Sequence, residues 1–303
     1  MQAFYSDHHV LPLPATHRFP IDKYRCLRDC VARNADAWGI ELRKSPEACR
    51  TQLARVHTST YLDKVFGGRL TDREQRRIGF PWSPAMLKRC LHSTGGTIAA
   101  AHQSLQDGFS AHLAGGTHHA FADAGQGYCV FNDVAVAATE LIQLGKVRKV
   151  VVIDCDVHQG NGTASIFADQ EDVFTFSMHG DRNFPFRKFA GDLDLALPDG
   201  LQDKDYLALL NEALETRLPL HQADCVFYLA GADVFAGDRL GRLQLSKSGI
   251  RARDETVLRA CHQRGLPITI VMSGGYAPDI QDVVEIHAET LQLAASFVTK
   301  AMR

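Results

Sequence analysis

The stretch VVIDCDVHQGNG, residues 151–162, constrains the fold more than any other part of the chain. Its run of β-branched apolar residues predicts a strand that is buried on both faces, as in a parallel sheet. The strand nevertheless ends in Asp154, Asp156 and His158, which are costly to bury in their charged forms. We therefore expect something at the end of this strand to compensate their charges.

Predicted helices and strands alternate from about residue 84 onward. The sequence predicts helices at residues 83–108, 132–145, 162–170, 203–218, 246–265 and 278–302, and strands at 110–116, 147–157, 172–180, 223–233 and 266–276. This alternation predicts an α/β fold, a single domain over residues 1–303 with a central, mostly parallel β-sheet flanked by helices on both faces. In the first 80 residues, 20–34 look helical and 73–84 look like a loop.

Composition and charge exclude several classes of protein. The formal net charge of -2 gives no general attraction to nucleic acid or to an anionic membrane. We expect no signal peptide, because no basic stretch precedes an apolar run at the start, and no membrane span, because no apolar run is long enough. Eight cysteines without a CxxC pair predict reduced thiols. These features predict a cytoplasmic protein that binds no nucleic acid.

Polar residues follow five of the predicted strands. They are His118 and His119; Asp154, Asp156 and His158; Ser177 and His179; Asp233; and Tyr276. Ligands of open parallel sheets bind outside the carboxyl ends of the strands. Five polar clusters at such ends therefore predict a single site that is assembled from across the sheet.

The residue types in these clusters favour metal chemistry. Two carboxylates and one imidazole can bind a divalent metal and leave a position open for water or substrate. Asp156, His158 and Asp233 form the natural set, with Asp154 as a neighbouring group. A metal bound there would polarise a carbonyl and activate a water molecule.

Other residues fit accompanying roles. His118 and His119 are candidates for proton transfer, and Tyr276 could donate a hydrogen bond to an oxyanion. Each feature alone has an ordinary explanation, because a lone aspartate often caps a helix and tandem histidines often lie at the surface. The segment GYCVFN, residues 127–132, fits a tight turn or a pocket wall. The combination favours one metal-dependent site.

With these motifs the chain resembles the zinc-dependent histone deacetylases of the arginase/deacetylase fold. The motifs GGTHH, GYCVFND, DCDVHQGNG, SMHG, AGADVFAGDRLG and SGGY occur in the family's order and at similar spacing. The resemblance extends from about residue 19 to residue 276. HQGNG and SGGY look most like the class IV branch and its bacterial relatives.

The resemblance implies roles for individual residues. It implies that zinc is held by Asp156, His158 and Asp233, with Asp154 beside His118, Asn161 beside His119, and Tyr276 as the donor to the scissile carbonyl. It implies K⁺ or Na⁺ near the zinc, at Asp154, Ser177, Met178 and the backbone of Asp156 and His158. It implies a substrate channel at Gly127 and Tyr128, with Phe184 or Phe186 opposite.

The implied reaction is metal-assisted hydrolysis that removes an acetyl or longer acyl group from the ε-amine of lysine, with His119 as the favoured base. The chain departs from the family pattern at two places. Asn161 stands where many members have an acid, and residues 77–86 lack the rim aspartate with which several peptide deacetylases hold the substrate backbone.

Three alternatives remain open at the level of sequence. One is a deacetylase of a small N-acetylated amine such as an acetylpolyamine, although no acidic gate is evident. Another is an arginase-like ureohydrolase, which needs two manganese ions and additional bridging carboxylates. The last is a non-catalytic module that binds acylated ligands, and the complete set of candidate catalytic residues disfavours it.

Overall fold

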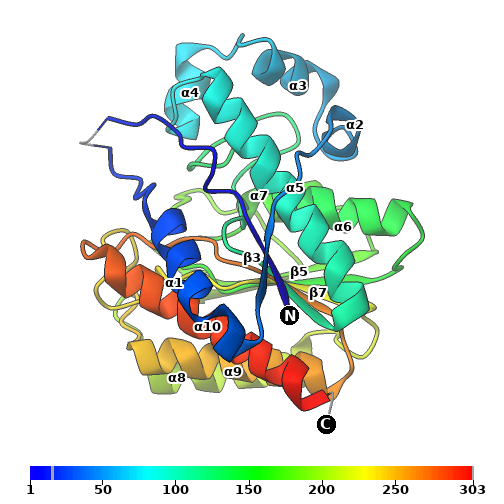
Figure 1. Cartoon of the computed structure of the whole chain (residues 1–303), viewed down its shortest axis with the longest axis vertical. Helices are drawn as coiled ribbons and strands as arrows, with labels where there is room; N and C mark the ends of the chain where they lie inside the picture. Colours follow the sequence, from blue (N-terminus) through cyan, green and yellow to red (C-terminus); the bar gives the residue numbers. More distant parts are fainter. Residues whose placement is uncertain (15–16, 302–303) are drawn as a thin grey trace.

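The computed structural model describes residues 1–14 and 17–301, and an eight-stranded sheet runs through its centre (Figure 1). The strands are β1 (Gln2–Tyr5), β2 (Glu41–Lys44), β3 (Phe109–His112), β4 (Val150–Asp154), β5 (Val173–Gly180), β6 (Leu193–Leu197), β7 (Cys225–Leu229) and β8 (Ile268–Val271). Their order across the sheet is β2-β1-β3-β8-β7-β4-β5-β6, and neighbouring strands pair in parallel. The carboxyl ends of the strands therefore lie along one edge.

Helices cover both faces of this sheet. They are α1 (Lys23–Trp38), α2 (Arg50–Leu53), α3 (Ser59–Phe66), α4 (Asp72–Ile78), α5 (Pro84–Asp107), α6 (Asp133–Gln143), α7 (Asn161–Phe167), α8 (Asp203–Glu212) with a π-helical turn η1 (Ala213–Arg217), α9 (Lys247–Gln263) and α10 (Ile280–Ala301). Figure 1 shows α5 and α6 above the sheet, α8, α9 and α10 below it, and α2 to α4 at the top of the molecule. Helix α1 packs against α10.

The central strands explain why the sequence shows apolar runs instead of alternation. In β4, Val151 and Ile153 join the apolar layer that contains α8, α9 and α10, whereas Val150 and Val152 join the layer that contains α5 and α6. Successive side chains of a strand point to opposite faces, so a strand covered on both faces is apolar throughout. The predicted fold class is confirmed. That all 303 residues form one domain stays a prediction.

The structure corrects the expected elements in several places. Strands β1, β2 and β6 were not expected, and residues 73–84 are not all loop, because α4 occupies Asp72–Ile78. The Thr71 side chain accepts a hydrogen bond from the Glu74 amide, and the Glu74 carboxylate accepts one from the Thr71 amide, which forms a capping box. Only Ile78 of this helix is buried, so its sequence shows no apolar periodicity.

Two further expectations concern thiols and membranes. All eight cysteines lie in the described part of the chain and are unpaired, as expected for reduced thiols. Within residues 1–14 and 17–301, no helix has both the length and the hydropathy needed to cross a bilayer.

Candidate active site

Three buried ligand side chains meet at the carboxyl edge of the sheet. Asp156 and His158 follow β4, and Asp233 follows β7, its parallel neighbour. Nδ1 of His158 lies 3.0 Å from Oδ1 of Asp156 and 3.1 Å from Oδ2 of Asp233. One ligand atom of each residue lies within 4.8 Å of the others. Two carboxylate oxygens and one imidazole nitrogen at this spacing fit a divalent metal with an open coordination position.

The remaining carboxylate oxygens are fixed by hydrogen bonds from neighbouring loops. Oδ2 of Asp156 accepts bonds from the Ser273 hydroxyl at 2.6 Å and the Gly274 amide at 2.7 Å. Oδ1 of Asp233 accepts a bond from the Val157 amide at 3.0 Å. A Cβ at Gly274 would lie 1.8 Å from Oδ2 of Asp233, so only glycine fits there. These outer contacts orient both carboxylates toward a common centre.

The two histidines lie beside that group, each with its own partner. Nδ1 of His118 lies 2.6 Å from Oδ2 of Asp154, and Nδ1 of His119 lies 2.8 Å from Oδ1 of Asn161. The two rings are 4.1 Å apart between centroids. Asn161 is the first residue of α7, whose N-cap is Gly160, so its side chain serves His119 and does not cap the helix.

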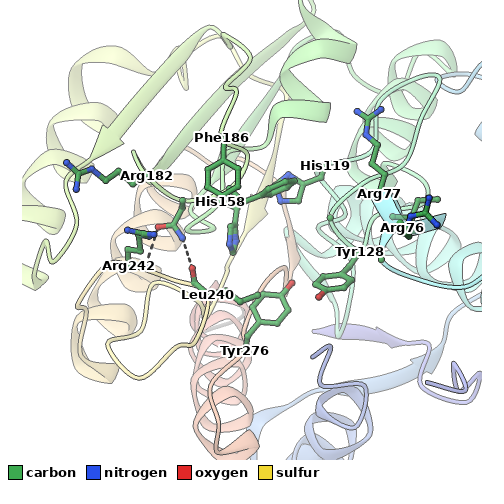
Figure 2. Close-up of a pocket in the computed structure, with 15 residues that line it drawn as sticks. Arg76, Arg77, His119, Tyr128, His158, Arg182, Phe186, Leu240, Arg242 and Tyr276 are labelled. Carbon is green, nitrogen blue, oxygen red and sulfur yellow. Dashed lines mark hydrogen bonds between the residues drawn. The ribbon is translucent and has the colours of Figure 1, made fainter. Parts of the chain in front are cut away.

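A cavity of about 380 Å³ leads to the ligand group. His119, His158 and Tyr276 line this cavity. Figure 2 shows His119 and His158 between Phe186 and the tyrosines Tyr128 and Tyr276. The substrate would therefore meet the candidate ligand His158, a second histidine and a phenol in one cavity.

The expected channel residues Gly127, Tyr128, Phe184 and Phe186 also line this cavity. The Phe184 ring packs edge-on against His119 with 4.9 Å between centroids, whereas the Phe186 side chain is 88% exposed and lies at the mouth. Tyr128 has a positive φ of 65°, and a Cβ at Gly79 would lie 2.8 Å from its ring. Glycine at position 79 thus leaves room for the Tyr128 wall.

The residues assigned to a monovalent cation occupy adjacent strands. Asp154 pairs in register with Ser177 across β4 and β5, and Met178 is buried in the core. Oδ1 of Asp154 accepts a hydrogen bond from the Asp156 amide at 3.1 Å, and the Ser177 hydroxyl lies 3.0 Å from Nδ1 of His179. The monovalent ion itself stays a prediction.

Residues 17–291 match the family model described as the histone deacetylase domain. The chain belongs to the histone deacetylase family.

Comparison with individual proteins gives the extent of the similarity. The chain is 42% identical over 284 residues to an uncharacterised protein of Picosynechococcus, covering 94% of this chain and 95% of that protein. It is 33% identical over 242 residues to a probable deacetylase of Methanothermobacter thermautotrophicus, covering 74% and 70%. The crystal structure of a histone deacetylase homologue from Aquifex aeolicus superposes with a TM-score of 0.81 at 24% identity, covering 97% of this chain and 83% of that one. This last similarity supports the fold.

The surroundings of the two histidines in this histone deacetylase family member are electrostatically different. Burial acts to lower the pKa of both. For His118, the charges of Asp154 and Asp156 together outweigh burial and raise the pKa to about 9. For His119, burial and the positive charge of His118 hold the pKa well below its usual range, and the hydrogen bond to Asn161 opposes this only in part. The neutral amide of Asn161 contributes no charge of its own.

Two buried carboxylates lie close together near the cavity. Burial, together with repulsion from Asp156, raises the pKa of Asp233 to about 7. Burial and both carboxylates raise the pKa of the Tyr276 hydroxyl well above its ordinary value, so it remains a hydrogen-bond donor at neutral pH. A divalent cation between the carboxylates would compensate the charges that made the end of β4 unusual.

Two residues that support Tyr276 were not expected from the sequence to take part in the site. Lys23, on α1, is only 3% exposed, and its Nζ donates to the carbonyls of Ser273 at 3.3 Å and Gly275 at 3.2 Å. Nζ also lies 5.1 Å from the centroid of the Tyr276 ring. The Asp238 carboxylate accepts a hydrogen bond from the Tyr276 amide at 2.6 Å. Both residues fix the SGGY loop.

The loop that carries the two histidines is held from the start of α6. The Asp133 carboxylate accepts hydrogen bonds from the amides of Gly116 at 3.0 Å and Thr117 at 2.7 Å. The Asn132 side chain donates to the Ala120 carbonyl at 3.1 Å. The Asn-Asp pair before an apolar helical segment is a recognisable cap, but its contact with the histidine loop is visible only in the structure.

A buried guanidinium contacts the backbone of both ligand loops. Arg253, on α9, donates from Nη1 to the carbonyls of Gly231 at 2.6 Å and Cys155 at 3.3 Å. Its Nε donates to the carboxylate of Asp254 at 2.9 Å, which balances its charge. Cys155 precedes the ligand Asp156, and Gly231 lies two residues before Asp233. Arg253 therefore fixes the separation of these two loops from below the sheet edge.

Proposed function

We propose that the protein is a zinc-dependent hydrolase that removes acyl groups, acetyl or longer, from the ε-amine of lysine. One observation carries the proposal: the side chains of Asp156, His158 and Asp233 converge beside a cavity that His158, His119 and Tyr276 line. Membership of the histone deacetylase family supports an amide-hydrolysing enzyme. Among residues 1–14 and 17–301, these three residues form the one buried group of potential metal ligands. A two-metal ureohydrolase would need additional bridging carboxylates, so this observation disfavours it.

The ligand set and Tyr276 would activate the scissile amide. Zinc held by Asp156, His158 and Asp233 would supply Lewis-acid activation of the acyl carbonyl and of a water molecule. The Tyr276 hydroxyl would donate a hydrogen bond to the carbonyl oxygen as negative charge develops on it. Lys23 and Asp238 hold the loop that positions this hydroxyl.

The hydrogen bonds of the histidines support His119 as the group that transfers the proton. With the Nδ1 proton directed at Asn161, the Nε2 atom of His119 is free to accept a proton from the attacking water. His119 lines the cavity, whereas His118 does not, so His119 would also return the proton to the leaving lysine amine. His118, held by Asp154, acts as the charged neighbour of this base.

The proposal extends to a potassium or sodium ion at Asp154, Ser177 and Met178 and at the backbone of Asp156 and His158. Such an ion would stabilise the β4 and β5 ends on which Asp154 and Asp156 depend. Replacing K⁺ and Na⁺ by choline at constant ionic strength should lower kcat. An unchanged kcat would argue against the monovalent site.

A panel of fluorogenic acyl-lysines, from acetyl to myristoyl, tests the main proposal when zinc is measured in the same sample. We expect turnover of at least one member with one zinc per chain. A hydroxamate should inhibit, because it chelates zinc through the open position. Full activity in a demonstrably metal-free sample would contradict the proposal, and binding of acyl-lysine without any turnover would identify a binding module instead.

A further inference from the structure

Four arginines are among the residues that line the cavity, whereas the described lining contains no aspartate or glutamate. Arg76 and Arg77 belong to α4, Arg182 lies in the loop after β5, and Arg242 lies in the loop between β7 and α9. Figure 2 shows the first two on one side of the cavity residues and the last two on the other. The mouth is therefore flanked by positive charge from both sides.

Little of this charge is neutralised within the protein. Among the described residues, the ion pairs of these arginines involve one carboxylate, Asp199, at 3.1 Å from Arg242 and 3.9 Å from Arg182. Arg77 donates to the amide oxygen of Gln126, which carries no charge. The side chains of Arg182 and Arg242 are 75% and 53% exposed, so they are accessible to a ligand.

The depth of these groups indicates which part of a substrate they meet. The candidate ligand His158 and its neighbour His119 are buried, whereas the four arginines are at least partly exposed. The acyl group must reach the buried end, so the residues on either side of the acylated lysine stay at the mouth.

We infer that the mouth selects acyl-lysines flanked by aspartate or glutamate and disfavours cationic substrates such as acetylated polyamines. The inference rests on the proposed deacylase function. Opposite charges accelerate encounter and like charges oppose it, and the planar guanidinium binds carboxylates through two parallel hydrogen bonds. Arginine side chains here provide a contact with flanking acids, in a chain that lacks the rim aspartate used by several peptide deacetylases.

Three peptides that share one acyl-lysine test this selectivity. One carries acidic residues on both sides of the lysine, one carries neutral residues, and one carries basic residues. We expect kcat/KM to fall in that order, with a difference on the order of tenfold between the acidic and basic peptides. The difference should shrink as salt rises from about 0.05 M to about 0.5 M, because salt screens exposed charges.

Paired variants separate the mouth from overall charge. Arg76→Gln with Arg182→Gln removes one arginine from each side and should reduce the acidic-to-basic ratio of kcat/KM to roughly threefold or less. The matched control is Arg33→Gln with Arg264→Gln. Arg33 lies in the second half of α1, and Arg264 follows α9 just before β8, at the opposite edge of the sheet from the site. The control changes net charge equally and should leave the ratio unchanged.

The outcomes distinguish this inference from the proposed function. Equal kcat/KM for acidic and basic peptides would overturn the inference and leave the function intact, as would an equal loss of preference in both double variants. Faster turnover of an acetylated polyamine than of the acidic peptide would also overturn it. If no peptide is hydrolysed, the proposed function fails, and fluorescence anisotropy of labelled peptides tests the mouth alone. Tighter binding of the acidic peptide would then support the inference, and equal Kd values would refute it.

Discussion

Two groups of three side chains that could hold a metal ion occur in the described part of this protein. Their spacing is similar, but they differ in residue type, burial and hydrogen bonding. Asp156, His158 and Asp233 are buried. The second group, here called the surface group, consists of His8 and His9 after β1 and His92 on α5; His8 is exposed and the other two are half-buried. In both groups the ligand atoms lie within 4.8 Å of one another. Proximity alone therefore does not distinguish a metal centre from a surface cluster.

The hydrogen bonds around the ligands do distinguish them. In the buried group, the backbone amides of Gly274 and Val157 fix one oxygen of each carboxylate. In the surface group, Nδ1 of His92 lies 2.9 Å from the Ser45 carbonyl. The His9 ring stacks on the His92 ring, and the His8 ring meets it edge-on. Against the effect of burial, hydrogen bonds to the two carboxylates of the buried group raise the pKa of His158 to about 10. The fixed orientation of its ligands favours metal binding at the buried group.

The largest expected effect comes from removing a buried ligand. Asp233→Ala should abolish zinc binding and lower activity by about 1000-fold or more, because a metal contributes several kcal/mol of transition-state stabilisation. Zinc per chain, measured by mass spectrometry, and kcat/KM should fall together. Retention of zinc with normal activity would show that Asp233 is not a ligand.

Tyr276→Phe should have the next largest effect, because it removes one donor beside the metal group and leaves the ligands intact. Loss of such a donor costs on the order of 100-fold in rate. We expect kcat to fall far more than KM rises, with zinc content unchanged. A change confined to KM would identify Tyr276 as a binding residue.

Asn161→Asp tests whether an outer partner also tunes the catalytic base. The pKa of His119 is held well below its usual range, and a carboxylate in place of the amide favours the imidazolium and raises it. Because His119 must be deprotonated to act as a base, the acidic limb of kcat/KM should move to higher pH.

The pH profiles of both proteins should be recorded at equal zinc occupancy. The measured value belongs to the coupled pair His118 and His119. An unmoved limb in the folded, zinc-loaded variant would show that Asn161 does not tune the base, and a shift to lower pH would contradict the electrostatic argument.

The smallest expected effect is at the surface group. His92→Ala removes the anchored histidine of that cluster, yet zinc content after dialysis and kcat/KM should stay within about twofold of the parent protein, in line with surface substitutions generally. Loss of one zinc equivalent in this variant would reverse the comparison between the two groups.

The sequence predicted the centre of this molecule better than its periphery. Strands β4, β5, β7 and β8 carry long apolar runs with polar ends, so both the sheet and the candidate ligands could be located. Strands β1 and β2 have four residues each, and β2, with the sequence ELRK, resembles a charged loop. Helix α4 buries only Ile78, so its capping box was the one available signal.

Supporting residues escaped prediction because their partners are distant in the chain. Lys23 holds the Ser273 carbonyl across 250 residues, and Arg253 holds the Cys155 carbonyl across 98. Nothing local marks either residue as part of a site. The same applies to the arginines of the mouth, which come from three separate segments.

The contact of Arg253 with both ligand loops has a consequence for how the protein acquires its metal. Because one guanidinium on α9 ties the carbonyls of Cys155 and Gly231 to the helix layer, the two loops are ordered when the chain folds. Metal uptake then requires little loss of conformational entropy and little rearrangement of the backbone. The centre should therefore exchange metal without local unfolding, and its affinity should be governed by how slowly the ion leaves.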